Sequence, residues 1–151
     1  MYREWNNYLF PLFLSTLSSC TLASYTDEEL RDELNNFAVR AITRFRFPRI
    51  DLKYIFDENG NGSFIENVTM NEIEVIVSWM KVLWLEYQLS KERNYENLYA
   101  DKDVKAFSSG NLITSIVKAL ETMTLSARKI EEFYYRSHNG VPTIGEVNAD
   151  E

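Results

Sequence analysis

Residues 57–65, DENGNGSFI, carry the side chains of a calcium-binding loop. They match the first nine positions of an EF-hand loop, which has oxygen ligands at positions one, three and five and glycine at position six. The twelfth position, where that loop places a bidentate glutamate, is Val68 here. We expect a hairpin turn, with a calcium-dependent binding module as an alternative. No calcium site is therefore expected at Asp57, Asn59 and Asn61.

Residues 9–20 suggest a second chemistry, the attachment of a lipid. An apolar run precedes the letters LSSC, which imitate a bacterial lipoprotein cleavage site with Cys20 as the lipidated residue. The charge of Arg3 is cancelled by Glu4, and Pro11 breaks the run, so the start of a signal peptide is poor. We interpret the run as an amphipathic packing helix, and a lipid-anchored bacterial surface or periplasmic protein stays open as the alternative.

A basic cluster lies near the end of a predicted helix over residues 27–45. Such side chains could contact phosphate, but they also suit the negative end of a helix dipole, and that explanation is sufficient. The cluster consists of Arg40, Arg44, Arg46, Arg49 and Lys53.

The sequence contains few residues that could support other catalytic chemistry. Cys20 is the only cysteine and His138 the only histidine, which excludes an intramolecular disulfide, a cysteine-based zinc site and a histidine-rich metal centre. There is no phosphate loop, and a Ser/His/Asp set would need His138. We expect no enzyme: no catalytic residues, no cofactor and no metal.

The composition suits one globular domain. The chain has 151 residues, 45% hydrophobic and 14% aromatic, which is enough to give three or four helices a common core. Its net charge of −7 repels nucleic acid and anionic membranes. Sequence-specific DNA binding and membrane association are therefore disfavoured.

Two segments begin with capping boxes, Thr26 to Glu29 and Thr69 to Glu72. The first predicts a helix that Pro48 stops. Its apolar positions recur at spacings of three and four and predict a buried face. This face consists of Leu30, Leu34, Phe37, Ala38, Ala41, Ile42 and Phe45.

The helix beginning at Thr69 is expected to reach about Lys91 and is apolar almost all round. We expect it to form the centre of the subunit or to pack on another subunit, with Trp79 or Trp84 buried. The charged residues 90–105 are expected to form a long connection with one helical turn. A narrow solvent-exposed stripe is predicted along this helix, consisting of Glu74, Ser78, Lys81 and Gln88.

A last two-faced helix is predicted from Ser108 or Asn111 to Arg136. The predicted fold is mainly α, a bundle of three to four helices with one inserted β-hairpin at residues 50–68. The apolar stripe of the last helix consists of Ile113, Ile116, Val117, Leu120, Met123, Ala127, Ile130 and Tyr134.

The chain is expected to form a single helical domain over residues 1–137. Residues 1–24 are interpreted as an N-terminal assembly arm outside the core, because they are too apolar for water and precede a capped helix that could fold without them. Residues 138–151 are interpreted as a flexible C-terminal tail that orders on a partner.

The order of features over residues 47–136, about three fifths of the chain, is similar to small neck proteins of tailed bacteriophages. In those proteins a Thr-x-x-Glu-Ile start is followed by a Phe-Ser-x-x-Asn helix opening. The matching segments here are FP at 47–48, TMNEIEVI at 69–76, WMK at 79–81, WL at 84–85, KAFSSGN at 105–111 and FYYR at 133–136.

The resemblance implies a structural virion protein, a head-to-tail connector subunit that assembles in the host cytoplasm into a usually twelvefold ring. Such a ring docks on the portal protein and on tail or neck proteins and lines the channel through which DNA passes without sequence recognition, with no membrane partner. The resemblance does not extend to the residues up to Ser24.

Overall fold

A computed structural model describes residues 2–17, 25–99 and 109–138. It is mainly helical (71%), with four helices and one small antiparallel hairpin, which confirms the predicted fold class. The helices are the π-helical turn η1 (Trp5–Leu9) continuing into α1 (Phe10–Ser15), then α2 (Asp27–Arg44), α3 (Met70–Tyr99) and α4 (Ser109–His138). The hairpin strands are β1 (Tyr54–Phe56) and β2 (Gly62–Phe64).

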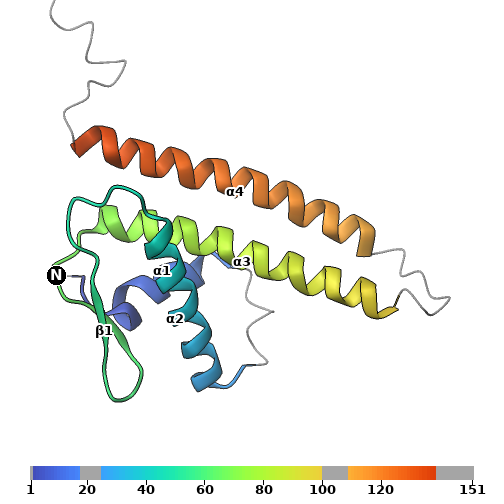
Figure 1. Cartoon of the computed structure of the whole chain (residues 1–151), viewed down its shortest axis with the longest axis horizontal. Helices are drawn as coiled ribbons and strands as arrows, with labels where there is room; N and C mark the ends of the chain where they lie inside the picture. Colours follow the sequence, from blue (N-terminus) through green and yellow to red (C-terminus); the bar gives the residue numbers. More distant parts are fainter. Residues whose placement is uncertain (1, 18–24, 100–108, 139–151) are drawn as a thin grey trace, which may run out of the picture.

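Helix α3 is the central element. Helix α4 runs antiparallel along one side of it, and α2, α1 and the hairpin lie on the other side, around the N-terminal half of α3 (Figure 1). The C-terminal half of α3 and the N-terminal half of α4 extend beyond the other elements as a two-helix projection (Figure 1). Helix α4 therefore has one main partner along most of its length.

The capping box at the start of α2 forms as predicted, and at the start of α3 the glutamate half of the predicted box is present. The Thr26 hydroxyl accepts a 3.2 Å hydrogen bond from the Glu29 backbone N–H, and the Glu29 carboxylate accepts a 2.9 Å bond from the Thr26 backbone N–H. At α3 the Glu72 carboxylate accepts a 2.9 Å bond from the Thr69 backbone N–H. The buried face of α2 agrees with the prediction in Leu34, Phe37, Ala38 and Ala41.

Helix α3 is apolar almost all round, as predicted, and Trp79 and Trp84 are both 7% exposed. The prediction that Ser78 is exposed to solvent is wrong. Ser78 is buried, and its hydroxyl donates a 2.6 Å hydrogen bond to the Val75 carbonyl one turn earlier. The prediction of a long connection at residues 90–105 is wrong for residues 90–99, because the helix continues through Tyr99. Residues 90–99 contain no proline or glycine to stop it. Residues 100–105 lie outside the described residues.

The N-terminal segment belongs to the core, which corrects the interpretation of residues 1–24 as an arm outside it. Trp5, Leu9 and Phe13 are fully buried and Phe10 is 4% exposed. Pro11 stands in the first turn of α1, where its missing N–H costs nothing. Residues 18–24 lie outside the described residues.

The hairpin is confirmed within the predicted range of 50–68. Tyr54 pairs with Phe64 and Phe56 with Gly62, and Gly60 adopts a left-handed φ of 78° in the turn. Gly62 lies directly against the Trp5 indole, where a Cβ atom would overlap the ring. Lack of a side chain at Gly62 is what allows the N-terminal helix to close on the hairpin.

Helix α4 follows the prediction to within two residues at each end. Ala127 and Tyr134 of its predicted stripe are buried, whereas the other stripe residues are half-buried or, at Met123, 38% exposed. The predicted tail begins one residue too early, because His138 still belongs to the helix. Residues 139–151 lie outside the described residues.

Candidate functional site

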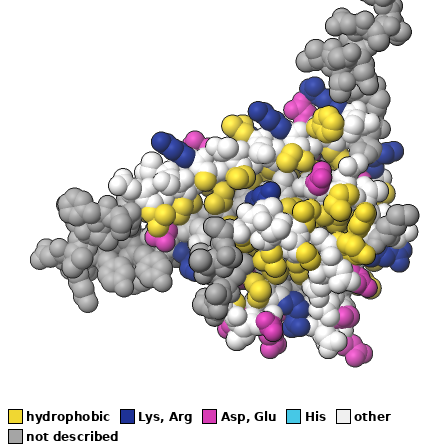
Figure 2. All heavy atoms as spheres, turned by 180° about the vertical axis from the view of Figure 1, so that it is seen from behind, with side chains coloured by type: hydrophobic (Ala, Val, Ile, Leu, Met, Phe, Trp, Pro, Cys, Tyr) yellow, Lys and Arg dark blue, Asp and Glu magenta, His cyan; other side chains and the backbone are white. Residues whose placement is uncertain are grey.

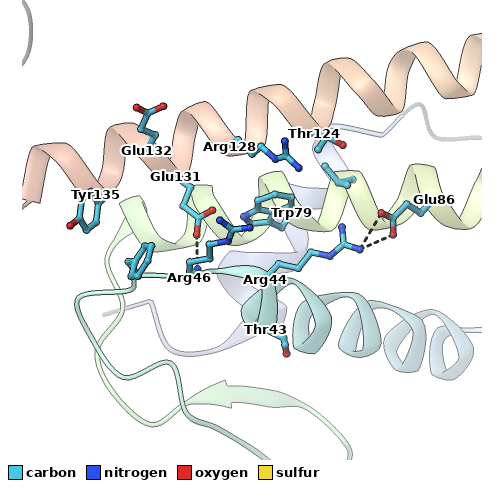
Figure 3. A pocket seen from close by; sticks show the side chains of 12 residues that line it. Thr43, Arg44, Arg46, Trp79, Glu86, Thr124, Arg128, Glu131, Glu132 and Tyr135 are labelled. Atoms are coloured by element: carbon cyan, nitrogen blue, oxygen red, sulfur yellow. Dashed lines mark hydrogen bonds and ion pairs between the residues drawn. The ribbon is translucent and has the colours of Figure 1, made fainter.

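An open groove of about 830 Å³ lies between α4, α3 and the C-terminal end of α2 (Figure 3). The loop after α2 closes one end. Three helices therefore place side chains from three distant parts of the sequence in one depression. Its lining consists of Thr43, Arg44, Arg46, Phe47, Trp79, Val82, Glu86, Thr124, Arg128, Glu131, Glu132 and Tyr135.

The floor of the groove is Trp79 of α3. The guanidinium of Arg44 lies over its ring, 5.9 Å from the centroid, and binds both carboxylate oxygens of Glu86 at 3.1 and 2.9 Å. The Trp79 indole N–H is buried and has no acceptor among the described residues. Arg44 is therefore held in place, and the floor retains one unsatisfied donor.

Two further arginines line the groove without an ion pair among the described residues. Arg46 reaches in from the loop after α2 and Arg128 from α4, and both side chains are exposed (Figure 3). The buried Glu131 carboxylate accepts a 2.6 Å hydrogen bond from the Arg46 backbone N–H, not from its guanidinium. Glu132 pairs with Arg136, so the guanidiniums of Arg46 and Arg128 are left without a carboxylate partner among the described residues.

Two exposed aromatic rings form the rim. Phe47 is 61% and Tyr135 42% exposed, and their ring centroids are 5.4 Å apart. Free guanidiniums beside exposed rings favour a ligand that carries carboxylates and apolar side chains.

A buried hydrogen-bond network lies beside the groove. The Tyr134 hydroxyl donates to the Glu72 carboxylate at 2.7 Å and accepts from the Arg49 backbone N–H at 3.0 Å. Burial by itself would raise the pKa of Glu72, but hydrogen bonds from Thr69 and Tyr134 outweigh it and lower that pKa. Burial, followed by the bond to Glu72, raises the pKa of Tyr134 to about 12.

The calcium-like segment forms a turn whose carboxylate is already hydrogen-bonded. Asp57 accepts bonds from the backbone N–H groups of Asn59 and Asn61 at 2.9 and 2.8 Å and from the Asn61 amide at 2.9 Å. The hydrogen bond from the Asn61 backbone is the main cause that lowers the pKa of Asp57. Within the described residues no group of three His, Cys, Asp or Glu side chains could hold a metal ion.

The lipoprotein alternative concerns Cys20, which lies outside the described residues. Cleavage before Cys20 would remove Trp5, Leu9, Phe10 and Phe13 from the core. No helix in the described part of the chain is both long and apolar enough to cross a membrane. The buried run therefore fits the packing interpretation better than a removable signal.

The predicted basic cluster does not form one site. Arg44 pairs with Glu86, Lys53 pairs with Asp51, and Arg46 turns into the groove. Arg46 and Arg128 could not be joined from the sequence, because they are 82 positions apart and Arg128 does not belong to the apolar stripe predicted for the last helix. The groove was therefore missed.

Apolar side chains also reach the surface outside the groove. Figure 2 shows hydrophobic side chains along much of the length of one face of the molecule. On α4 the exposed ones include Leu112 (46%), Leu125 (57%) and Phe133 (67%).

Comparison of the chain with protein-family models, with curated proteins and with solved structures gives no match. The groove and the exposed surface of α4 are therefore the observations that bear on function.

Proposed function

We propose that the protein is a structural subunit of the head-to-tail connector of a tailed bacteriophage, twelvefold in its assembled ring and docked on the portal. The observation that carries the proposal is the uncovered apolar edge of α4, defined here by Leu112, Met123 and Phe133. These side chains are 46%, 38% and 67% exposed. Exposed apolar side chains that recur along one side of a helix make that side a candidate interaction surface.

The three residues of the edge share one side of the helix. At about 100° per residue they fall within about 80° of each other around the axis, so a second helix can contact all three. Leu125 lies about 160° from Met123 and about 140° from Leu112 around the axis, so it faces away from those two residues of the edge. Because α4 has one main partner along most of its length, this edge is free to pack on another subunit.

The charge of the chain supports a role beside DNA without binding it. A net charge of −7 disfavours adhesion to phosphate, as the wall of a DNA channel requires. The resemblance of residues 47–136 to phage neck proteins adds the portal and the adjoining tail or neck proteins as partners, and the virion as the place of action.

The proposal is tested by mixing the purified protein with the portal protein encoded beside it and imaging the particles by electron microscopy. A ring of the protein on the portal is expected, together with its presence in purified virions. Absence from virions and from every portal complex would refute the proposal.

A matched pair of variants tests the edge. Met123→Glu places a charge in the proposed contact and should prevent ring formation, while Leu125→Glu makes the same kind of change about 160° away around the helix and should not. Both side chains are exposed, so the helical circular dichroism spectrum of each variant should equal that of the unmodified protein.

A further inference from the structure

We infer that the groove is a peptide-binding site whose occupant in the ring is the acidic segment 143–151 of a second copy of this chain. The inference rests on the proposed ring. It assigns to each subunit a donor segment, TIGEVNADE, and an acceptor groove at a different place on the surface.

The charge balance of the groove favours an acidic peptide. Each lining carboxylate already accepts a hydrogen bond: Glu86 from Arg44, Glu131 from a backbone N–H, and Glu132 from Arg136. The guanidiniums of Arg46 and Arg128 have no carboxylate among the described residues. The lining carries equal numbers of arginines and glutamates, but these two guanidiniums remain without a carboxylate partner, and each can bind an incoming carboxylate in bidentate fashion.

The segment has the matching chemistry. Glu146, Asp150 and Glu151 supply carboxylates, and Ile144 and Val147 supply apolar side chains between them. The groove offers Arg46 and Arg128 for the former and the rings of Trp79, Phe47 and Tyr135 for the latter.

Nucleic acid fits the groove less well. Duplex DNA carries about one charge per 1.7 Å, which is more than two unpaired guanidiniums in one groove can match. A peptide with three carboxylates in nine residues can place them on the two free arginines and keep the others in water.

The geometry favours a second copy over the same chain. The part of α4 that lines the groove, residues 124–135, comes before the end of the helix at His138, and the helix axis runs away from the groove toward that end. The thirteen residues that follow can span about 45 Å when extended, enough to reach a neighbour. A contact between two different patches is heterologous, and its repetition does not stop at a twofold dimer but forms a ring where the rotation closes.

The test uses full-length protein alone, without portal. Val147 is replaced by p-benzoylphenylalanine, which keeps the three carboxylates, and ¹⁵N-labelled and unlabelled copies are mixed before photolysis. Mass spectrometry should find cross-links from residue 147 to residues 43–49 or 124–135, and heavy–light pairs should make up a large share of them, as contacts between randomly mixed copies require. Pairs of a single isotope only, or no cross-links to the groove, would overturn the inference.

Charge variants show whether the arginines make the site. Arg46→Glu and Arg128→Glu should each reduce the heavy–light cross-links about tenfold. Lys118→Glu, an exposed change on α4 that does not line the groove, should leave their yield unchanged. An equal loss with Lys118→Glu would show unspecific electrostatics and would defeat the assignment.

A second set of substitutions, outside the described fold, distinguishes loss of binding from misfolding. Glu146→Gln with Asp150→Asn and Glu151→Gln removes the three carboxylates from the donor and should reduce the same cross-links about tenfold. Undiminished cross-linking would refute the role of charge. Because no portal is present, this experiment can succeed or fail independently of the virion assay, so the two proposals are distinguishable.

Discussion

The hydroxyl of Tyr134, near the end of α4, donates a 2.7 Å hydrogen bond to the carboxylate of Glu72, in the first turn of α3. Both residues are buried, at 3% exposure each. The same hydroxyl accepts the Arg49 backbone N–H at 3.0 Å. One side chain thus joins the start of α3, the end of α4 and the loop after α2, next to the arginine groove.

Tyr134→Phe should destabilise the protein by about 1–3 kcal/mol, because the change leaves a buried carboxylate without one donor and the Arg49 N–H without its acceptor. The measurement is the free energy of unfolding from urea denaturation. Tyr135→Phe is the matched control: that side chain is 42% exposed, and a change within about 0.5 kcal/mol is expected. Equal effects of the two variants would show that the network is energetically unimportant.

Glu72→Gln should cost about 1.5–3 kcal/mol at pH 7, since charged hydrogen bonds from Thr69 and Tyr134 are lost. The pKa of Glu72 is lowered in the folded state, so its stabilisation is present above its unfolded pKa of about 4.3 and is lost as pH falls through the folded pKa. The difference between variant and unmodified protein should therefore shrink at pH 3. A difference independent of pH would mean that Glu72 is not ionised in the fold.

Features set by neighbouring residues were predictable from the sequence. The capping boxes at Thr26 and Thr69 need only residues three positions apart, and the hairpin follows from the Asn-Gly turn between two short aromatic strands. The end of α3 was missed because residues 90–99 are polar, although polarity does not end a helix that has a neighbour to pack on.

Features set by distant residues were not predictable. The sequence predicts Glu72 only as a helix-capping residue. Nothing in the sequence shows that Tyr134, 62 positions later, donates a hydrogen bond to its carboxylate. The apolar N-terminal run shows that it needs a partner surface, but not that this surface is α3 and the hairpin of the same chain. Arg46 and Arg128 likewise come to line one groove only through tertiary packing.

Gly62→Ala should destabilise the protein by about 1–3 kcal/mol, because the added methyl group overlaps the Trp5 indole and forces the N-terminal helix off the hairpin. Ser63→Ala, one residue along the same strand, is the control and should change the free energy of unfolding by less than about 0.5 kcal/mol. The two are compared by urea denaturation. A neutral Gly62→Ala would contradict the close packing of Trp5 on β2.

Trp84→Ala should cost about 3–5 kcal/mol. The indole is 7% exposed and contacts the rings of Phe37 and Tyr87, with centroids 6.0 Å away in both cases. Phe133→Ala, which truncates a 67% exposed ring, serves as the comparison and should be nearly neutral in the monomer. Thermal unfolding of the dilute protein measures both, and a neutral Trp84→Ala would show that α2 does not pack on α3 through this residue.

The two ends of the chain should respond oppositely to truncation. Removal of residues 1–17 deletes Trp5, Leu9, Phe10 and Phe13 from the core. At about 1.5–3 kcal/mol for each buried side chain, the loss is comparable with the whole stability of a small domain, about 5–15 kcal/mol. The shortened protein should therefore fail to show a cooperative unfolding transition.

Removal of residues 139–151 takes no described core residue with it, and the midpoint of thermal unfolding should stay unchanged at low protein concentration. Circular dichroism at 222 nm during heating measures both truncations. A cooperative transition in the protein that lacks residues 1–17 would restore the interpretation of that segment as an arm, because it would show that α2, α3 and the hairpin bury a sufficient core without it. The buried Trp5 indole between β1, β2 and Phe10 is the reason to expect the opposite.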